Sequence, residues 1–439
     1  MPSPWDKIIK IYRQDIAYLE SVINMPRREY LLGLADRRIF IERLRKFLAL
    51  LGHPEKGQNF LHITGTSGKG STVTILQRFL TDSGAKVGIY TSPFATTSLE
   101  KIQINDCLIS PLELHAILQK NIKPALDLYL TKYSTEPPSY FEIWLAMALL
   151  YFRQNHCDWV VLEAGLGGTH DATNVIVNPR VTAITNIGLD HTDILGNTKL
   201  KIAADKSGII KKGTKFFTAE KSPELVKFFR KKCRQQKAEF VALKNLANRY
   251  PTGSYFNTIR QKENLNLALN ILKRLKIKSP RAPQIIKNYR LICRQEIIQK
   301  NPLVILDGAH NEDKIANLMA FVRKQKYRRL HLIVGFAFSK NWAKPLRRLL
   351  AISDYVYLTH FLISERKAAS LGRLYRISEK MASSKPKKIY SDPWQALTEA
   401  IKKADKKDLI LITGSFFLAG ELRKKWVSEE YILKNLKTQ

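Results

Sequence analysis

The stretch that most constrains this chain of 439 residues is a glycine-rich turn between an apolar run and an amphipathic run. Residues 60–72 read Phe-Leu-His-Ile-Thr-Gly-Thr-Ser-Gly-Lys-Gly-Ser-Thr. Residues 60–63 predict a buried strand, and residues 72–80 predict the start of a helix. Backbone N–H groups of such a turn, together with the amino end of the helix, favour an anion. We therefore predict a phosphate-binding loop formed by Gly65, Thr66, Ser67, Gly68, Lys69, Gly70, Ser71 and Thr72.

The spacing of this loop differs from that of the common nucleotide-binding loop, in which Ser or Thr directly follows the lysine. Here two residues separate Gly65 from Gly68, and Gly70 separates Lys69 from Ser71. An ordinary strand-to-helix turn would not need a lysine and a serine at these positions. We predict that Lys69 reaches the outer phosphates of a nucleotide and that the Ser71 hydroxyl ligates Mg²⁺.

Composition indicates a globular protein of two or three domains, since 45% of the residues are hydrophobic. The longest apolar run, residues 143–152, is too short to cross a bilayer. The chain begins Met-Pro-Ser-Pro-Trp-Asp, which shows no secretory pattern. The four cysteines lie far apart in the sequence, which favours reduced thiols. We expect a monomeric, cytoplasmic protein that has no membrane partner.

The charge is strongly basic, with 73 Lys and Arg against 38 Asp and Glu and a net charge of +35. This balance is compatible with a nucleic-acid partner, with anionic small substrates, or with a lysine-rich genome alone. The basic residues are spread over the whole chain, and no interleaved aromatic platform stands out. We therefore expect small-molecule substrates and no nucleic acid.

Strands and helices alternate along the chain, which predicts an α/β fold with a doubly wound, mostly parallel sheet. A second, smaller α/β series follows the break at residues 278–283. We predict an ATP-binding domain over residues 1–290 and a Rossmann-like domain over residues 291–439, with helices over residues 5–52. Ligands of such sheets lie at the carboxyl ends of the strands.

Two further polar groups follow predicted strands and are expected to meet the phosphate loop. Glu163 ends the apolar strand at residues 158–163, and His191 comes shortly after the strand at residues 181–187. With Ser71, they offer a carboxylate, an imidazole and a hydroxyl, to which phosphate oxygens and water would add the remaining Mg²⁺ ligands. Alternatively, Glu163 caps a turn and His191 is a structural histidine.

Several motifs together resemble the folylpolyglutamate synthase/dihydrofolate synthase family of the Mur ligase superfamily. They run in the family's order from about residue 30 to residue 422 and cover most of the chain. The motifs are the loop at 65–71, Ser92-Pro93-Phe94, Glu163-Ala-Gly-Leu-Gly-Gly168, Asp171-Ala-Thr-Asn174, Gly188-Leu-Asp-His191, Asp307-Gly-Ala-His-Asn311 and Thr413-Gly-Ser415.

The resemblance implies an ATP-dependent ligase that adds L-glutamate to dihydropteroate, to folates or to both through an acyl phosphate, with two Mg²⁺ ions. It implies metal ligation by Ser71, Glu163, His191 and a carbamate on Lys206, and ATP contacts from Asn264, Arg294, Asp307 and His310. The implied catalytic residues are Lys69, Glu163, His191, Lys206 and His310. The implied substrate side includes Ser92, Pro93, Phe94 and Asp171, with residues 92–100 as a mobile loop. Closure of the C-terminal domain is expected to protect the acyl phosphate from water.

The chain departs from the family pattern at four positions. Thr169 and Lys101 stand where the family usually has arginine, Arg260 where it has histidine, and Cys293 where it has glycine. These positions bear on the pterin and glutamate contacts. Two alternatives stay open: another ligase of the superfamily acting on cell-wall precursors, and a nucleotide-dependent nucleic-acid-binding protein. The motifs Ser92-Pro93-Phe94 and Asp171-Ala-Thr-Asn174 favour the folate branch.

Overall fold

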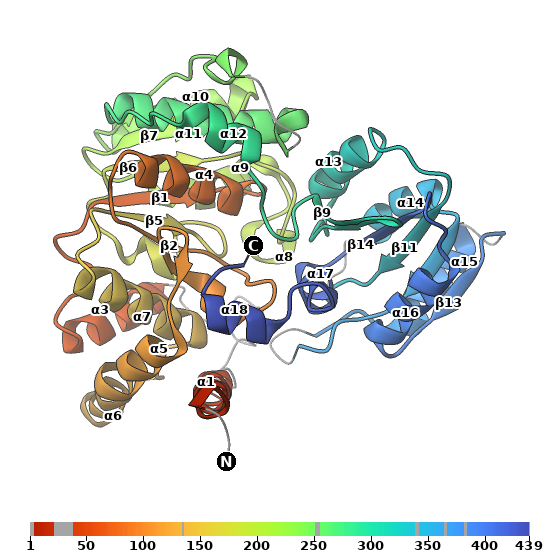
Figure 1. The fold of residues 1–439 in the computed structure, drawn as a ribbon. Helices are drawn as coiled ribbons and strands as arrows, with labels where there is room; N and C mark the ends of the chain where they lie inside the picture. Colours follow the sequence, from red (N-terminus) through yellow and green to blue (C-terminus); the bar gives the residue numbers. More distant parts are fainter. Residues whose placement is uncertain are drawn as a thin grey trace. The chain divides into compact units, whose positions relative to one another are not determined.

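The computed structural model describes residues 4–21, 38–133, 136–250, 255–338, 342–363, 367–381 and 384–438. The helical prediction for residues 5–52 is confirmed at both ends, and residues 22–37 lie outside the described part. The chain forms two compact units (Figure 1). The first unit comprises Met1–Ser92, Leu99–Thr252 and Arg260–Lys287, and the second comprises Pro93–Ser98, Gly253–Ile259 and Asn288–Gln439.

The first unit is built on an eight-stranded sheet of order β4-β3-β2-β5-β1-β6-β7-β8. The strands from β2 to β8 in this order are parallel, and β3 and β4 add an antiparallel edge. Strands such as β1 and β6 are buried at every position because both faces of the sheet are covered. The strands are β1 (Phe60–Thr64), β2 (Val87–Tyr90), β3 (Ile102–Ile104), β4 (Cys107–Leu108), β5 (Trp159–Glu163), β6 (Val181–Ile184), β7 (Lys215–Thr218) and β8 (Glu239–Phe240).

Helices that begin at polar caps connect these strands. Ser110 and Ser139 each form a capping box with a glutamate three residues later, which sets the start of α5 and α7. Helix α4 packs on β1, β2 and β5, and α7 packs on β2. The helices are α1 (Pro4–Ser21), α3 (Arg38–Leu50), α4 (Lys69–Asp82), α5 (Pro111–Ile117), α6 (Lys123–Lys132), α7 (Tyr140–Gln154), α8 (Thr192–Leu195), α9 (Lys199–Lys206), α10 (Pro223–Gln235), α11 (Ile259–Arg274) and α12 (Ala282–Asn288).

The second unit is built on a six-stranded sheet of order β13-β12-β11-β14-β10-β9, in which only β9 is antiparallel to its neighbour. Apolar residues alternate between its two faces: Leu411 belongs to one core cluster, and Ile410 and Ile412 belong to the other. The strands are β9 (Glu296–Lys300), β10 (Leu303–Leu306), β11 (Leu330–Val334), β12 (Tyr355–Leu358), β13 (Lys387–Ile389) and β14 (Leu409–Thr413).

Helices cover both faces of this second sheet. Helices α13 (Glu312–Val322), α14 (Ala343–Ile352) and α15 (Leu371–Met381) pack on one face. Helices α16 (Pro393–Lys403) and α17 (Phe416–Arg423) pack on the other, and α18 (Glu429–Asn435) follows them in the chain. The predicted α/β class with mostly parallel sheets is thus confirmed in each unit.

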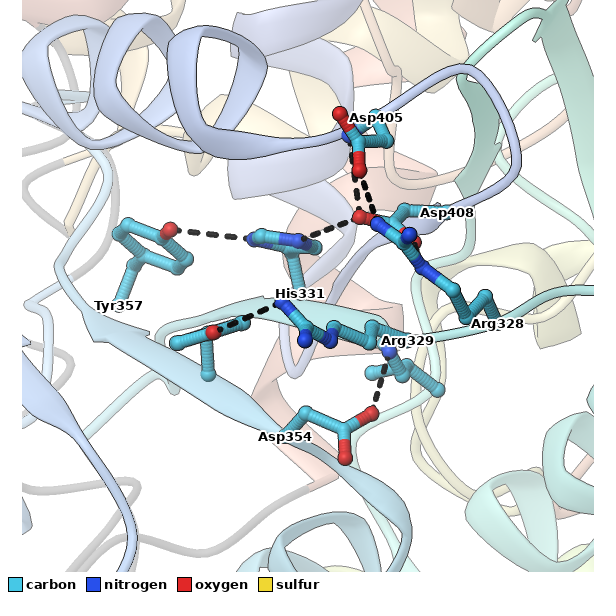
Figure 2. A network of polar contacts seen from close by, with 9 residues as sticks. Arg328, Arg329, His331, Asp354, Tyr357, Asp405 and Asp408 are labelled. Carbon is cyan, nitrogen blue, oxygen red and sulfur yellow. Dashed lines mark hydrogen bonds and ion pairs between the residues drawn. The ribbon is translucent and has the colours of Figure 1, made fainter.

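A buried polar network braces the amino ends of β11, β12 and β14 (Figure 2). His331 is fully buried, with Nδ1 3.1 Å from the Tyr357 hydroxyl and Nε2 3.4 Å from Asp408 Oδ2. Burial lowers the pKa of His331, although Asp408 opposes the shift. The adjacent Asp354 accepts the Leu330 N–H at 2.6 Å. Both ring nitrogens of His331 have partners, so this histidine is structural.

Candidate active site

The phosphate loop is shorter than the sequence predicts, because α4 begins at Lys69. Gly68 is the residue before the helix, and its φ of 86° lies in the left-handed region that glycine adopts without strain. Lys69, Gly70 and Ser71 therefore lie in the first helical turn rather than in the loop. Ser71 is 8% exposed. The first turn of a helix presents backbone N–H groups without intrahelical acceptors, as an anion site requires.

The residues that follow β6 hold the loop in place. The Ser67 N–H donates to Asn186 Oδ1 at 2.9 Å, and the Thr185 hydroxyl donates to the Ser67 carbonyl at 2.6 Å. The Gly188 N–H donates to Thr66 Oγ1 at 2.9 Å. Thr185 and Asn186 were expected to be strand residues, but β6 ends at Ile184. Sequence reasoning missed their role because only the parallel pairing of β1 with β6 brings them to the loop.

The side chains of two residues predicted to contact the nucleotide lie against the phosphate loop. The Lys69 ammonium donates to the Gly65 carbonyl at 3.1 Å, so the side chain lies over the turn. Asn264 comes from α11, and a Cβ placed on Gly68 would lie 2.7 Å from its Cγ. The structure therefore brings Asn264 to the phosphate loop from a distant part of the sequence.

Glu163 lies beside the first turn of α4. A Cβ on Gly70 would come 3.1 Å from Glu163 Oε2, and the same oxygen accepts the Ser92 N–H at 3.3 Å. Glu163 as a whole is 6% exposed. Glu163 thus meets the first turn of α4 from the carboxyl end of β5, beside Gly70, the residue directly before Ser71.

His191 lies further from its strand than the sequence suggests. It follows β6 by seven residues, precedes α8, and has a φ of 49°. Its ring is 40% exposed, with Nε2 3.9 Å from Asp190 Oδ1. Gly188, three residues earlier, is bonded to Thr66 of the loop. The segment before His191 therefore meets the loop, while the position of the ring relative to Ser71 stays a prediction.

Lys206 is a buried lysine at the end of α9, with only 3% of its surface exposed. Burial and the charge of Lys69 lower its pKa to about 7, against the opposing charges of Asp205, Asp190 and Asp171. A lysine in this state is partly a neutral amine at neutral pH, and a neutral amine is a nucleophile. Its surroundings thus fit the covalent modification that the resemblance implies.

The donor set suits a hard divalent cation if Lys206 carries an anionic oxygen. Among the described residues, no group of three or more His, Cys, Asp and Glu side chains could hold a metal. Glu163 and His191 would therefore need the Ser71 hydroxyl, a carbamate on Lys206 and phosphate oxygens to complete an oxygen-rich shell for Mg²⁺. The residues present fit such an ion.

The residues predicted for the substrate side divide into two groups. Phe94 packs edge-on against Phe417 in the second unit, with ring centroids 6.4 Å apart, and Ala95 lies against Gly420. Thr96, Thr97, Ser98 and Glu100 are buried. These contacts place residues 93–98 with the second unit, whereas sequence reasoning assigned them to the N-terminal domain.

Asp171 is occupied by its own chain. Its Oδ2 accepts the Leu166 N–H at 2.7 Å, and its Oδ1 accepts the Thr173 N–H at 3.0 Å and the Thr173 hydroxyl. Burial raises the pKa of Asp171, while these hydrogen bonds and Lys69 oppose the rise. The Thr173 hydroxyl in turn lies 2.7 Å from Nε2 of the fully buried His62 in β1. In this geometry Asp171 shapes the 165–174 turn, and a direct substrate contact stays a prediction.

Each departure from the family pattern has a local structural setting. Lys101 is buried, with its ammonium 4.3 Å from both the Tyr140 and Trp144 ring centroids. Arg260 pairs with Glu263 at 3.1 Å on the surface of α11. Cys293 has a φ of 50°, which explains why a glycine suits this position in the family. Thr169 packs on the segment that carries Lys206.

The second unit gathers its own predicted residues at the carboxyl ends of β10 and β14. Asp307 accepts the Gln295 and Ala309 N–H groups at 2.8 and 2.7 Å, and burial raises its pKa against the opposing charge of Arg294. The Ala309 carbonyl accepts the Gly414 N–H at 3.0 Å. This pairing unites the two motifs that the sequence places a hundred residues apart.

His310 and Arg294 are both held in place within this group. His310 Nδ1 lies 2.9 Å from the Gly308 carbonyl, and its Nε2 lies 3.1 Å from the Lys314 ammonium. The imidazole is therefore the Nδ1–H tautomer, with Nε2 accepting from lysine. The Arg294 guanidinium lies 4.4 Å from the Phe416 ring centroid.

Two family models match the chain. The Mur ligase middle domain matches residues 63–281, and the Mur ligase, glutamate ligase domain matches residues 293–416. No helix among the described residues is long and apolar enough to span a membrane.

Similar proteins cover nearly the whole chain. The dihydrofolate synthase/folylpolyglutamate synthase of Bacillus subtilis is 34% identical over 414 residues, which is 87% of this chain and 94% of that protein. The folylpolyglutamate synthase of Thermotoga maritima is 28% identical, with a TM-score of 0.74 over 89% of this chain and 95% of that one. E. coli FolC, solved with DHPP and ADP, is 25% identical, with a TM-score of 0.77 over 94% of this chain and 97% of that one. The chain therefore belongs to the dihydrofolate synthase/folylpolyglutamate synthase family of Mur ligases.

Proposed function

We propose that this protein is an ATP-dependent ligase that joins L-glutamate to dihydropteroate, to folates or to both. The observation that carries the proposal is the phosphate loop, with Glu163 against Gly70, Asn264 against Gly68, and the buried Lys206 electrostatically coupled to Lys69. The names of similar proteins support the substrate class.

The reaction joins a carboxylate to an amine in two transfers. A carboxylate oxygen of the pterin substrate attacks the γ-phosphorus of ATP, the bond from that phosphorus to the bridging oxygen breaks, and ADP leaves. The amine of glutamate then attacks the acyl carbon, inorganic phosphate leaves, and the amine loses a proton to solvent. The carboxylate and phosphate groups are all anionic, which means that the protein contributes mainly positioning and positive charge.

The residues of the first unit divide these tasks. Backbone N–H groups of residues 66–72 and the Lys69 ammonium bind the phosphates, and Asn264 contacts the nucleotide beside Gly68. Two Mg²⁺ ions would be held by Ser71, Glu163, His191 and carbamylated Lys206, and when bound they neutralise phosphate charge. The carbamate forms when the neutral Lys206 amine attacks CO₂: an N–C bond forms, a C–O electron pair moves to oxygen, and a proton leaves.

The second unit contributes Arg294, Asp307 and His310 to nucleotide and phosphate binding in this proposal. We divide the chain into an ATP-binding domain at residues 1–290 and a C-terminal ligase domain at residues 291–439, and we propose that domain closure excludes water from the acyl phosphate. We further propose that the protein acts as a monomer in the cytoplasm on small molecules, with no nucleic-acid partner.

One assay tests the proposed function. ADP release is measured with ATP, Mg²⁺ and L-glutamate while the acceptor is varied among dihydropteroate, tetrahydrofolate and a cell-wall precursor. Glutamate-dependent release with a pterin acceptor is the expected result. Release with the cell-wall precursor alone would overturn the folate proposal in favour of another ligase of the superfamily.

A further inference from the structure

Residues 165–174 lie along the segment that carries Lys206. The Thr169 N–H and the Thr169 hydroxyl both donate to the Asp205 carbonyl, at 3.0 and 2.7 Å. The Gly168 N–H donates to the Asp205 carboxylate at 2.9 Å. One short turn thus holds both the backbone carbonyl and the side-chain carboxylate of Asp205, the residue directly before Lys206.

These hydrogen bonds close the carboxyl end of α9, where carbonyl groups lack intrahelical donors. The Ala204 carbonyl accepts the Ser207 hydroxyl at 2.7 Å, and the Asp205 carbonyl accepts both Thr169 donors. The helix therefore ends at Lys206, and the Asp205 carbonyl of its last turn is capped by Thr169, which lies 36 positions before Asp205 in the chain.

The two backbones approach so closely that neither can shift without disturbing the other. A Cβ on Gly168 would lie 2.6 Å from the Lys206 carbonyl oxygen and 2.8 Å from its Cα. A Cβ on Gly208 would lie 2.5 Å from the Thr169 Cα and would overlap its hydroxyl. Asn174 Nδ2 donates to the carbonyls of Thr169 and Gly208, at 2.9 and 3.4 Å.

We propose that Thr169 is a positioning residue that holds the backbone of Lys206, so that the amine stays at its buried place and takes up CO₂. The backbone N–H of any residue at position 169 could make one of the two contacts, and the hydroxyl contact depends on the threonine side chain. The inference rests on the proposed role of Lys206 and deepens it, because it names the residue on which that role depends.

The first test compares Thr169→Val, which keeps the shape of the side chain without the hydroxyl, with Thr169→Ser, which keeps the hydroxyl. Hydrogen exchange over residues 205–210 is measured in the full chain, and the carbamate is observed by ¹³C NMR in ¹³C-bicarbonate. Thr169→Val is expected to exchange roughly five- to tenfold faster, the effect of one lost hydrogen bond, and to lose most of the carbamate signal. Thr169→Ser is expected to retain both.

A second variant reaches the same contact from the other side. Gly208→Ala is expected to displace Thr169 and weaken the carbamate signal, whereas Gly372→Ala in α15, where the nearest atom is 3.9 Å away, is its control.

Unchanged exchange and an undiminished carbamate in Thr169→Val would overturn the proposal. A wild-type chain that carries the carbamate but ligates no glutamate would refute the proposed function and leave the role of Thr169 standing. Absence of the carbamate from the wild-type chain would refute the role of Lys206 and, with it, this proposal.

Discussion

Lys69 and Ser71 place two polar groups in the first turn of α4, where a phosphate and its cation would lie. We expect Lys69→Ala and Ser71→Ala each to reduce ligation more than tenfold, which corresponds to about 1.4 kcal/mol of transition-state stabilisation. The melting temperature should stay close to that of the wild-type chain. Lys402→Ala on the exposed surface of α16 serves as the control. Retention of more than about a tenth of the rate by either variant would show that the phosphate-loop assignment is wrong.

The pKa of Lys206 predicts how activity depends on pH when CO₂ is scarce. Burial and Lys69 lower this pKa to about 7, so the amine is mostly neutral above that pH and mostly an ammonium below it. Only the neutral amine takes up CO₂. At a fixed concentration of dissolved CO₂, we expect ligation to fall as the pH drops below about 7 and to recover when CO₂ is raised. A pH profile that does not respond to CO₂ would argue against the carbamate.

Chemical rescue tests the same lysine independently of pH. Lys206→Ala should lose ligation and regain part of it when acetate supplies a carboxylate to the vacant position. Lys206→Arg should be inactive, because the guanidinium stays charged and forms no carbamate. Full activity of Lys206→Arg, measured as ADP release, would remove the carbamate from the mechanism.

Residue types and the family resemblance predicted which side chains meet the phosphate loop better than they predicted the residues that hold the loop in place. Lys69, Glu163 and Asn264 lie at the loop as predicted. The prediction was possible because these residues belong to motifs that are typical of phosphate and metal binding. Thr185 and Asn186 have no such signal, since threonine and asparagine next to a strand are common in any α/β protein. Their role depends on which strand pairs with β1, and that pairing is not written in the local sequence.

At the scale of elements, the phosphate-loop helix is anchored at its far end. Asp82, the last residue of α4, accepts the Ser279 hydroxyl at 2.5 Å, the Arg281 N–H at 2.9 Å and Arg281 Nε at 2.6 Å. A carboxylate at a helix carboxyl end opposes the helix dipole, so these donors must offset that repulsion. They join α4 to the segment that leads into α12.

Replacing this anchor should destabilise the fold in a pH-dependent way. Burial alone would raise the pKa of Asp82, but the Ser279 and Arg281 interactions outweigh it and lower the pKa. Its contribution is therefore present above the unfolded pKa of about 4 and is lost as the pH falls through the lower folded value. Asp82→Asn should lower the free energy of unfolding at pH 7 by about 1–2 kcal/mol, and by less near pH 3. Denaturant unfolding measures this, with the exposed Asp106→Asn as control.

Long, strongly patterned elements were predictable from the sequence, and several short strands were not. The apolar residues 143–152 form the buried interior of α7, and β1, β5 and β6 coincide with predicted strands to within a few residues. The predicted second α/β series is present as β10 to β14 and their helices. Sequence reasoning missed β3, β4, β7, β8 and β9. Strands β8 and β9 are partly exposed at sheet edges and carry few apolar residues, so they lack the continuous pattern on which the prediction depends.

At the scale of the whole molecule, two short segments of the chain belong to the second unit, although the residues on either side of them belong to the first. Residues 93–98 belong to the second unit, where Ala95 lies against Gly420 of α17 so closely that a Cβ there would overlap the Ala95 carbonyl. Linear sequence reasoning could not foresee this, because it assigns a segment to the domain that surrounds it in the chain. We expect Gly420→Ala to displace residues 93–98 and to raise the KM for the pterin acceptor more than the KM for ATP. Equal changes in both values, with Gly372→Ala as control, would contradict this role of the segment.

The division of labour between the units gives the last prediction. His310 and Asp307 lie at the carboxyl end of β10, and in the proposed mechanism they act on the nucleotide bound by the other unit. His310→Ala and Asp307→Ala in the full chain should therefore lower turnover, while an exposed control such as Lys344→Ala should not.

A chain ending at residue 290 should keep the sheet of the first unit, because its core residues come from within that unit. Circular dichroism would show whether it folds, and ADP release would show whether it acts. This shortened chain lacks α17, so Phe94 loses its packing against Phe417, and it lacks Asp307 and His310. We expect it to bind ATP and to form no product. Normal product formation by the folded, shortened chain would show that the second unit has no part in the chemistry.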